Sequence, residues 1–344
     1  MRALKLVSPN VLEIQEVPVP ELGPLDVLVQ VAGAGLCHTD LSVLRGPRRP
    51  GALTLGHETA GTVAAMGAEV SGLDEGDPVL VCLVWSCGTC RACLDGRENV
   101  CTTARGRAAT PPCPGLGPDG GMADYIRVEA RFLEPLRGLD PVTAGPLADA
   151  GLTPMHAING ARHRLAPGAT AVVIGVGGLG HMGLQILRAT ADVRVVAVDL
   201  SREKLDLALE HGADEVVLAD AESAARILDL TDGDGAEAVF DFVGAQPTLD
   251  LAANAVAPDG AMRIIGAGGG SITFGTMVKP GEVPWGVDLR KSYTGTRADQ
   301  RQVIDLAREG KISVETQQYA LDDAIAAFDD LDAGRVRGRA VLVP

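Results

Sequence analysis

Apolar and polar positions follow two different periods along this chain, and the change of period divides it into two parts. In residues 1–150, short apolar or alternating runs are separated by clusters of Gly and Pro. That pattern is typical of β-strands joined by turns. From residue 151 to about 285, short β-branched runs alternate with segments in which apolar residues recur every three or four positions. Such alternation predicts a parallel, doubly wound α/β sheet.

The apolar runs locate the expected elements. In the first part we expect strands at residues 11–16, 27–32, 59–66, 78–84 and 123–128. In the second part we expect strands at residues 171–174, 193–198, 215–218, 238–243 and 261–266, and helices at 201–211, 221–230 and 248–256. Near the end we expect a strand at residues 291–295, a helix at 300–309 and a strand at 340–344, whereas the glycine-rich residues 268–285 should be irregular.

The stretch that follows the strand at residues 171–174 is a candidate dinucleotide-binding turn. It has the pattern G-x-G-x-x-G, with the residues Gly175, Val176, Gly177, Gly178, Leu179 and Gly180. A helical apolar pattern and a second buried strand come next, and that strand ends in Asp199, nineteen residues after Gly180. Strand, glycine turn, helix, strand and acid in this order are the dinucleotide fingerprint, in which a helix N-terminus binds the pyrophosphate. The sequence therefore predicts an NAD-binding Rossmann domain.

Composition limits the remaining possibilities. Apolar residues make up 46% of the chain and aromatic residues only 3%, so the cores should be aliphatic and rich in alanine. The net charge of −15 argues against nucleic acid and anionic membranes as partners. No apolar run is long enough to span a membrane, and the first residues lack the apolar stretch of a signal peptide. We therefore expect a cytoplasmic protein whose cysteines bind metal rather than form disulfides.

Four of the seven cysteines have the spacing of a metal site. The order is Cys87-x2-Cys90-x2-Cys93-x7-Cys101. Zinc takes four thiolates tetrahedrally, and four protein ligands leave no open position, so the sequence predicts a structural zinc site. Cys82 and Cys113 lie outside the four and are expected to be buried thiols.

A second set of possible metal ligands is scattered along the chain. Cys37 stands in the segment GLCHTD, His57 stands in GHE, and Asp149 stands in PLADAG. Taken singly, Cys37 and His57 are equally compatible with a core thiol and a core histidine. The order of the motifs is more specific: GLCHTD, GHE before a glycine-rich strand, the four cysteines and then VVIGVGGLG. In this order the whole chain resembles the zinc-dependent medium-chain alcohol dehydrogenases. The segments ADAGLTPMHAI, AVVIGVGGLGHMGLQILRA and AVFDFVGAQ are most similar to bacterial NAD-dependent secondary alcohol dehydrogenases.

This resemblance implies an α/β protein with two domains and two zinc ions. Residues 1–150 and 286–344 would form a β-rich, GroES-like catalytic domain, and residues 151–285 would form the Rossmann domain. Cys37, His57 and Asp149 would ligate a catalytic zinc ion. Glu58 would lie close behind the metal, and Asp40 would accept a hydrogen bond from the second ring nitrogen of His57.

The resemblance also implies roles at the cofactor. Thr39 would pass a proton between the substrate and the cofactor ribose, His38 would lie near the pyrophosphate, and Arg339 would contact phosphate. Asp199 would bind the ribose hydroxyls and disfavour a 2′-phosphate, while the nearby Arg202 would partly offset that repulsion.

Two positions depart from the family pattern. Asp149 stands where many relatives carry cysteine, which makes the metal site less rich in thiolate. Ser42 stands where some relatives have a histidine that ends the proton relay.

The activity implied is hydride transfer between NAD(H) and secondary alcohols or their ketones, with a small molecule as substrate. Ser42 and Thr294 are small and would leave room for two substituents, although both could instead face solvent or backbone. Trp85, Leu116 and Trp285 are candidate apolar walls, although Trp85 could equally pack against the zinc loop. Relatives form dimers or tetramers, so a homo-oligomer is expected. A polyol or amino-alcohol dehydrogenase of the same superfamily is an alternative, and a non-catalytic zinc- and nucleotide-binding module is an alternative of a different class.

Overall fold

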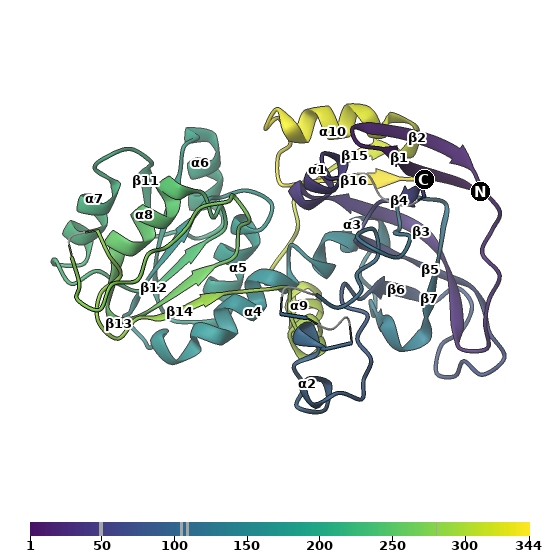
Figure 1. The fold of residues 1–344 in the computed structure, drawn as a ribbon, viewed down its shortest axis with the longest axis horizontal. Helices are drawn as coiled ribbons and strands as arrows, with labels where there is room; N and C mark the ends of the chain where they lie inside the picture. Colours follow the sequence, from purple (N-terminus) through teal and green to yellow (C-terminus); the bar gives the residue numbers. More distant parts are fainter. Residues whose placement is uncertain (48–50, 104–105, 108–109, 280) are drawn as a thin grey trace. The chain divides into compact units, whose positions relative to one another are not determined.

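A computed structural model describes residues 1–47, 51–103, 106–107, 110–279 and 281–344. The chain forms two compact units (Figure 1). Unit 1 comprises Met1–Leu152, Thr294–Glu309 and Val314–Pro344, and unit 2 comprises Thr153–Tyr293 and Gly310–Ser313. From the sequence we expected the second division at residue 286, whereas in the structure the chain stays with unit 2 through Tyr293.

Unit 1 is built mainly on antiparallel strands. Its strands are β1 (Arg2–Ser8), β2 (Val11–Glu16), β3 (Asp26–Leu36), β4 (Leu53–Thr54), β5 (Glu58–Met66), β6 (Pro78–Val81), β7 (Tyr125–Glu129), β8 (Leu133–Pro135), β15 (Thr316–Ala320) and β16 (Arg339–Val343). One sheet has the order β2-β1-β4. A larger one has the order β15-β16-β3-β5-β6-β8, with β7 also paired to β3. Only β15 and β16 among the described strand pairs of unit 1 are parallel. The central strand β3 is buried over most of its length and joins β5, β7 and β16.

Short helices connect these strands. They are α1 (His38–Leu44), α2 (Arg91–Leu94), α3 (Pro141–Ala144), α9 (Arg297–Arg308) and α10 (Ala324–Asp332), with 3-10 turns η1 (Glu98–Val100), η2 (Ala130–Phe132), η3 (Gly145–Ala148) and η5 (Leu321–Asp323). The core of unit 1 is largely aliphatic, as the composition predicts, and Leu4, Leu36 and Leu342 are fully buried in it.

Unit 2 is a parallel sheet with helices between its strands, as predicted (Figure 1). The strands are β9 (Thr170–Ile174), β10 (Arg194–Asp199), β11 (Glu215–Leu218), β12 (Ala236–Asp241), β13 (Val256–Ile264) and β14 (Asp288–Lys291). Their order is β11-β10-β9-β12-β13-β14. The helices are α4 (Leu152–Ala161), which begins at the last residue of unit 1, α5 (Gly180–Thr190), α6 (Arg202–Glu210), α7 (Ser223–Leu230) and α8 (Gln246–Ala255), with the 3-10 turn η4 (Arg162–Arg164).

The last strand of this sheet lies earlier in the chain than predicted. We expected residues 291–295, but β14 ends at Lys291. Its sequence, Asp-Leu-Arg-Lys, has one apolar residue, so it gives no buried-strand signal. A buried ion pair helps to hold it: Arg263 of β13 is 0% exposed and donates to the Asp288 carboxylate at 2.6 Å and to the Gly160 carbonyl of α4 at 2.6 Å.

Among the described residues, no helix is long and apolar enough to cross a membrane.

Candidate functional site

Pairing of β3 with β5 brings the first two candidate ligands together. Cys37 directly follows β3, and His57 directly precedes β5. In the antiparallel register Gly35 faces Glu58, so the end of one strand lies beside the start of the other. Asp40, in the first turn of α1, accepts a hydrogen bond from the Cys37 amide at 2.9 Å and fixes the backbone of that ligand.

Asp149, which follows η3, completes a cluster of possible metal ligands. The ligand atoms of Cys37, His57, Glu58 and Asp149 all lie within 4.8 Å of one another, and all four residues are buried. Asp149 Oδ2 lies 3.6 Å from Cys37 Sγ and 3.7 Å from His57 Nε2. Ordinary zinc bond lengths and tetrahedral angles give separations of roughly 3.6 and 3.4 Å for these atom pairs. The three side chains therefore fit a zinc ion with one open position.

The second ring nitrogen of His57 faces Asp40. His57 Nδ1 lies 3.4 Å from Asp40 Oδ1, and Asp40 is fully buried. Burial alone would lower the pKa of His57, but the negative charge of Asp40 and the nearby Asp149 raise that pKa well above its usual value. Neither His57 Nδ1 nor Asp40 Oδ1 has a hydrogen-bond partner among the described residues, so the orienting hydrogen bond expected of Asp40 stays a prediction.

Glu58 and Arg339 form a buried ion pair beside the cluster. Arg339 donates to Glu58 Oε1 at 2.5 Å and lies 3.5 Å from Asp149 Oδ2. Burial raises the pKa of Glu58 to about 7 although the positive charge of Arg339 opposes this shift. Glu58 Oε2 is buried and has no hydrogen-bond partner among the described residues. A Cβ at position 35 would come within 2.0 Å of this oxygen. The Glu58 carboxylate therefore fits here because residue 35 is glycine.

Arg339 therefore has a role that the sequence did not indicate. We expected its guanidinium to contact the phosphate of a cofactor. In the structure the residue is 2% exposed, and its NH2 group faces Glu58 and Asp149. The phosphate contact stays a prediction.

A glycine-rich loop, which the sequence analysis also missed, supports His57. Gly121 and Met122 donate to the carbonyls of Gly56 and Leu55, each at 2.9 Å. Gly56 has a φ of 99°, and a Cβ on Gly120 would lie 2.2 Å from the Gly56 oxygen. The clustering of glycines at residues 115–121 was a visible signal, but its partner could be identified only from the tertiary contact.

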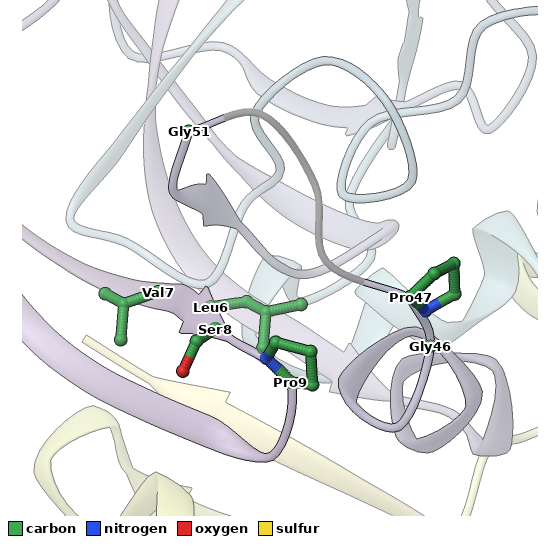
Figure 2. Close-up of a pocket in the computed structure, with 7 residues that line it drawn as sticks. All are labelled: Leu6, Val7, Ser8, Pro9, Gly46, Pro47 and Gly51. Carbon is green, nitrogen blue, oxygen red and sulfur yellow. The ribbon is translucent and has the colours of Figure 1, made fainter.

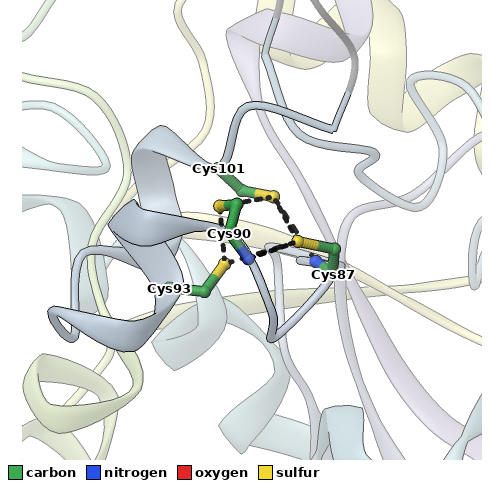
Figure 3. Close-up of side chains that lie close together, drawn as sticks. All are labelled: Cys87, Cys90, Cys93 and Cys101. Atoms are coloured by element: carbon green, nitrogen blue, oxygen red, sulfur yellow. Dashed lines mark hydrogen bonds between the residues drawn. The ribbon is translucent and has the colours of Figure 1, made fainter.

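The four closely spaced cysteines converge as predicted (Figure 3). Sulfur atoms lie 3.5 Å apart in Cys87–Cys101 and Cys90–Cys93, and 3.9 Å apart in Cys87–Cys93 and Cys90–Cys101. Four thiolates around one zinc ion would lie about 3.8 Å apart. The set therefore fits a closed zinc site.

Local hydrogen bonds favour the thiolate form of Cys87, whereas burial raises the pKa of Cys93 to about 12. Amides of Thr89 and Cys90 donate to Cys87 Sγ at 3.4 and 3.3 Å. Hydrogen bonds from Thr103, Thr89 and the Cys90 amide lower the pKa of Cys87 to about 5. By contrast, Cys82 and Cys113 are buried thiols, as expected, and burial raises the pKa of each to about 12.

The dinucleotide turn of unit 2 shows why its glycines are needed. Gly175 has a φ of 87°, and a Cβ on Gly180 would lie 1.8 Å from the Gly175 oxygen. A Cβ on Gly177 would meet nothing within 4 Å, so the backbone is open there to a ligand. Gly178 and Leu179 continue the turn, and α5 begins at Gly180. The turn lies between β9 and β12, where the strand order changes direction, which is the usual ligand position in such sheets.

Asp199 ends β10 beside this turn. Its two carboxylate oxygens accept hydrogen bonds from the amides of Val176 at 2.8 Å and Ser201 at 2.9 Å. The carboxylate is thus held against the glycine turn, where a ribose would follow the pyrophosphate. Arg202 is exposed at the start of α6.

The remaining candidate residues near this cluster lie on α1. Thr39 Oγ1 lies 3.7 Å from Cys37 Sγ, which places a hydroxyl beside the possible metal ligands. His38 is exposed, and Ser42 is exposed with its hydroxyl donating to the His38 carbonyl at 3.1 Å. Ser42 thus makes the backbone contact considered as one of its alternatives.

The candidate substrate walls come from both units of the structure. Trp85 stacks on Phe132 with ring centroids 5.7 Å apart and donates to the Cys82 carbonyl, so it packs into unit 1. Leu116 packs on the small cluster of Leu83, Cys113 and Leu152. Trp285 belongs to unit 2 and is 62% exposed.

Thr294 is not on a strand, contrary to the prediction. It follows β14 and has a φ of 44°, a conformation that β-branched residues rarely adopt. Its Oγ1 is buried without a hydrogen-bond partner among the residues that the structure describes.

A small pocket lies between the end of β1 and the turn after α1 (Figure 2). Its lining residues are Leu6, Val7, Ser8, Pro9, Gly46, Pro47 and Gly51. None of them belongs to either cluster of metal ligands, and we assign the pocket no role.

Comparison with known proteins matches two parts of the chain to two described families. Residues 23–138 match the family described as alcohol dehydrogenase GroES-like domain, and residues 178–309 match the zinc-binding dehydrogenase family. The chain is 38% identical to a D-arabinose 1-dehydrogenase (NADP(+)) of Saccharolobus solfataricus, over 97% of this chain and 94% of the relative. It is 34% identical to an NAD-dependent alcohol dehydrogenase of Sulfolobus acidocaldarius, over 96% of each chain.

Solved structures show the same fold over the full length. The alcohol dehydrogenase of the archaeon Aeropyrum pernix matches with a TM-score of 0.91 and 36% identity, covering 100% of both chains. An acetophenone reductase from Geotrichum candidum, solved with NAD, matches with a TM-score of 0.86 and 29% identity, covering 100% of this chain and 97% of that one. With two sets of zinc ligands, a dinucleotide turn and full-length relatives at this identity, the chain belongs to the zinc-dependent medium-chain alcohol dehydrogenase family.

Proposed function

We propose that this protein is an NAD-dependent oxidoreductase that transfers hydride between NAD(H) and secondary alcohols or their ketones. The observation that carries the proposal is the buried cluster of Cys37, His57 and Asp149, whose spacing fits zinc with one position left for a substrate oxygen. A closed set of four ligands would suit a binding module, whereas an open set of three is typical of catalysis.

The side chains around this cluster have complementary roles. Cys37, His57 and Asp149 would hold a zinc ion, which would supply a Lewis acid able to polarise the oxygen of an alcohol or carbonyl. Thr39 Oγ1, 3.7 Å from Cys37 Sγ, accepts the proton of the alcohol and passes it on. Arg339 offsets the negative charge that Glu58 and Asp149 bring to the site. Asp40 keeps His57 in the orientation in which Nε2 faces the site.

Asp199 makes NAD the preferred cofactor. A carboxylate at this place accepts hydrogen bonds from the ribose hydroxyls and repels a 2′-phosphate. Because Arg202 lies nearby on an exposed helix start, NADP should be disfavoured without being excluded. The pyrophosphate would bind at the open backbone of Gly177 and the N-terminus of α5.

A second candidate substrate class is a sugar. The relative at 38% identity is named for D-arabinose, and the polyol dehydrogenases considered from the sequence are chemically close to it. We place secondary alcohols first because the sequence segments around Asp149 and the glycine turn resemble the secondary alcohol enzymes. A homo-oligomer in the cytoplasm, dimer or tetramer, completes the proposal.

The test measures metal content and turnover on the same preparation. Two zinc ions per chain are expected, together with NADH formation from 2-butanol that exceeds formation from ethanol. The panel should include D-arabinose and sorbitol, each with NAD and NADP. A kcat/KM for D-arabinose above that for every simple alcohol would replace the proposed substrate class, and absence of turnover with two bound zinc ions would favour a binding module.

A further inference from the structure

The turn that carries Asp149 is packed against helix α9. Asp149 follows η3 with φ −127° and ψ −58°, outside the helical range, and its amide donates to the Pro146 carbonyl at 3.2 Å. Two residues later a Cβ on Gly151 would lie 2.6 Å from a methyl group of Val303 in α9. The metal ligand is therefore on a short irregular segment whose position depends on what it packs against.

One polar side chain of α9 reaches into this segment. Gln300 is 1% exposed, and its Nε2 donates to the Leu147 carbonyl at 3.0 Å in a buried hydrogen bond. Leu147 lies two residues before Asp149. Burying a primary amide is unfavourable unless it makes hydrogen bonds, and Gln300 Oε1 has none among the described residues. Because burying the amide is unfavourable, the hydrogen bond that its N–H group donates to Leu147 is the feature for which we seek a function.

Hydrogen bonds and ion pairs hold helix α9 against the rest of unit 1, and they thereby fix the position of Gln300. Thr296 caps the helix and exchanges hydrogen bonds with Asp299. Arg297 and Arg301 both bind the carboxylate of Glu134, which is 5% exposed on β8, at distances of 2.7 to 3.2 Å. The helix thereby connects the sheet of unit 1 to the turn of the metal ligand.

We propose that Gln300 is a positioning residue for the third zinc ligand. Its amide holds the Leu147 carbonyl, and through it the turn that directs Asp149 Oδ2 toward Cys37 and His57. This inference rests on the proposed function, because it assumes zinc at that cluster. Partners that orient metal ligands typically change metal affinity by about 10- to 100-fold when removed. Gln300 would act on the turn itself, so we expect an effect at the lower end of that range.

The test follows zinc release, with Gln300→Met as the variant because methionine has similar length and no donor. Wild type and variant, each loaded with zinc, are mixed with excess colorimetric chelator, and the two release phases are timed. We expect the fast phase, assigned to the catalytic cluster, to quicken about ten-fold, while the slow phase of the four cysteines is unchanged. Cobalt substituted at the catalytic cluster should also show an altered visible spectrum.

Ile304→Ala is the matched control. Ile304 is 3% exposed on the same helix, so the substitution loosens α9 without removing the amide donor. The proposal is overturned if Gln300→Met releases zinc at the wild-type rate, or if Ile304→Ala speeds release and alters the cobalt spectrum equally. Should Gln300→Met not fold, Gln300→Asn carries the same comparison, since its amide is one methylene too short.

The two proposals fail in different ways. If wild-type protein binds one zinc ion or shows no NAD-dependent turnover, the proposed function fails. If wild type binds two and turns over, but the Gln300 variants release zinc normally, only the positioning role fails.

Discussion

At the scale of single residues, the cluster of candidate zinc ligands brings several charged side chains together in the interior. Glu58, Asp149 and Arg339 lie together with almost no exposure to solvent. Removing one partner of such a group usually costs about 3–5 kcal/mol, because it leaves an uncompensated charge in the interior. The expected residue types could be found from motifs, but this pairing could not, because Arg339 lies 281 residues from Glu58 in sequence.

Asp199 carries the first prediction at this scale. Asp199→Ala should lower kcat/KM for NAD about ten-fold or more, since a hydrogen bond to a charged group contributes about 1.5–3 kcal/mol. The ratio of NAD to NADP efficiency should fall. Initial rates with both cofactors provide the measurement. Asp199→Asn keeps an acceptor for the Ser201 amide, and Asp206→Ala removes an exposed acid of α6 as a control. An unchanged ratio in both Asp199 variants would exclude the role given to this carboxylate.

Thr294 carries the second prediction. A β-branched residue at φ 44° is strained by about 1–3 kcal/mol, and glycine adopts this conformation without penalty. Glycine also makes the unfolded chain more flexible, which offsets part of the gain. Thr294→Gly should therefore raise the free energy of unfolding by about 1 kcal/mol in urea titration. Asn10→Gly is the control, because asparagine tolerates its φ of 61° and little should change. If Thr294→Gly instead lowered the free energy of unfolding, the contacts of the threonine side chain would stabilise the fold by more than the backbone strain destabilises it.

At the scale of elements, the sequence predicted those helices and strands whose apolar residues recur with a clear period. β2 and β11 have the bounds expected, and α6 lies within the predicted range because Ser201 caps it. Residues 268–285 are irregular in their described part, as expected. The prediction failed for β14, where one apolar residue gives no pattern, and missed α1, whose seven residues are too few to show a period.

The glycine turn permits a paired prediction at this scale. Gly177→Ala should leave Tm unchanged, since its Cβ would meet no atom within 4 Å, but should raise KM for NAD by obstructing the pyrophosphate. Gly180→Ala should lower Tm, because its Cβ would overlap the Gly175 oxygen and force α5 away from β9. Thermal unfolding and NAD titration of both variants test the pair. Equal losses of Tm would show that Gly177 is structural and has no special role at the ligand.

At the scale of the whole molecule, the chemistry is divided between the units. Both clusters of metal ligands lie in unit 1, and the dinucleotide turn lies in unit 2. The residues of unit 1 come from three separate parts of the chain, Met1–Leu152, Thr294–Glu309 and Val314–Pro344. The local spacing of the four cysteines predicted that they come together, and the resemblance to the family predicted that Cys37, His57 and Asp149 come together. They did not predict that α9 packs against the Asp149 turn, because that contact joins residues about 150 positions apart.

The number of proposed protein ligands, three at one site and four at the other, predicts that loss of zinc from the two sites has different effects on the protein. Cys37→Ser should abolish turnover yet change Tm by no more than about 4 °C, roughly 1 kcal/mol for a domain of this size, because an open site contributes little to folding. Cys90→Ser should lower Tm further or reduce soluble yield, because zinc binding by four cysteines is part of the folding free energy. In both variants ADP-ribose should still bind, since the turn at Gly175–Gly180 is in unit 2 and contains no metal ligand. Zinc content, thermal unfolding and titration with ADP-ribose on the same samples distinguish the sites. Normal turnover in Cys37→Ser would remove the catalytic assignment, and an unchanged Tm with one zinc ion lost in Cys90→Ser would show that the four-cysteine site is not structural.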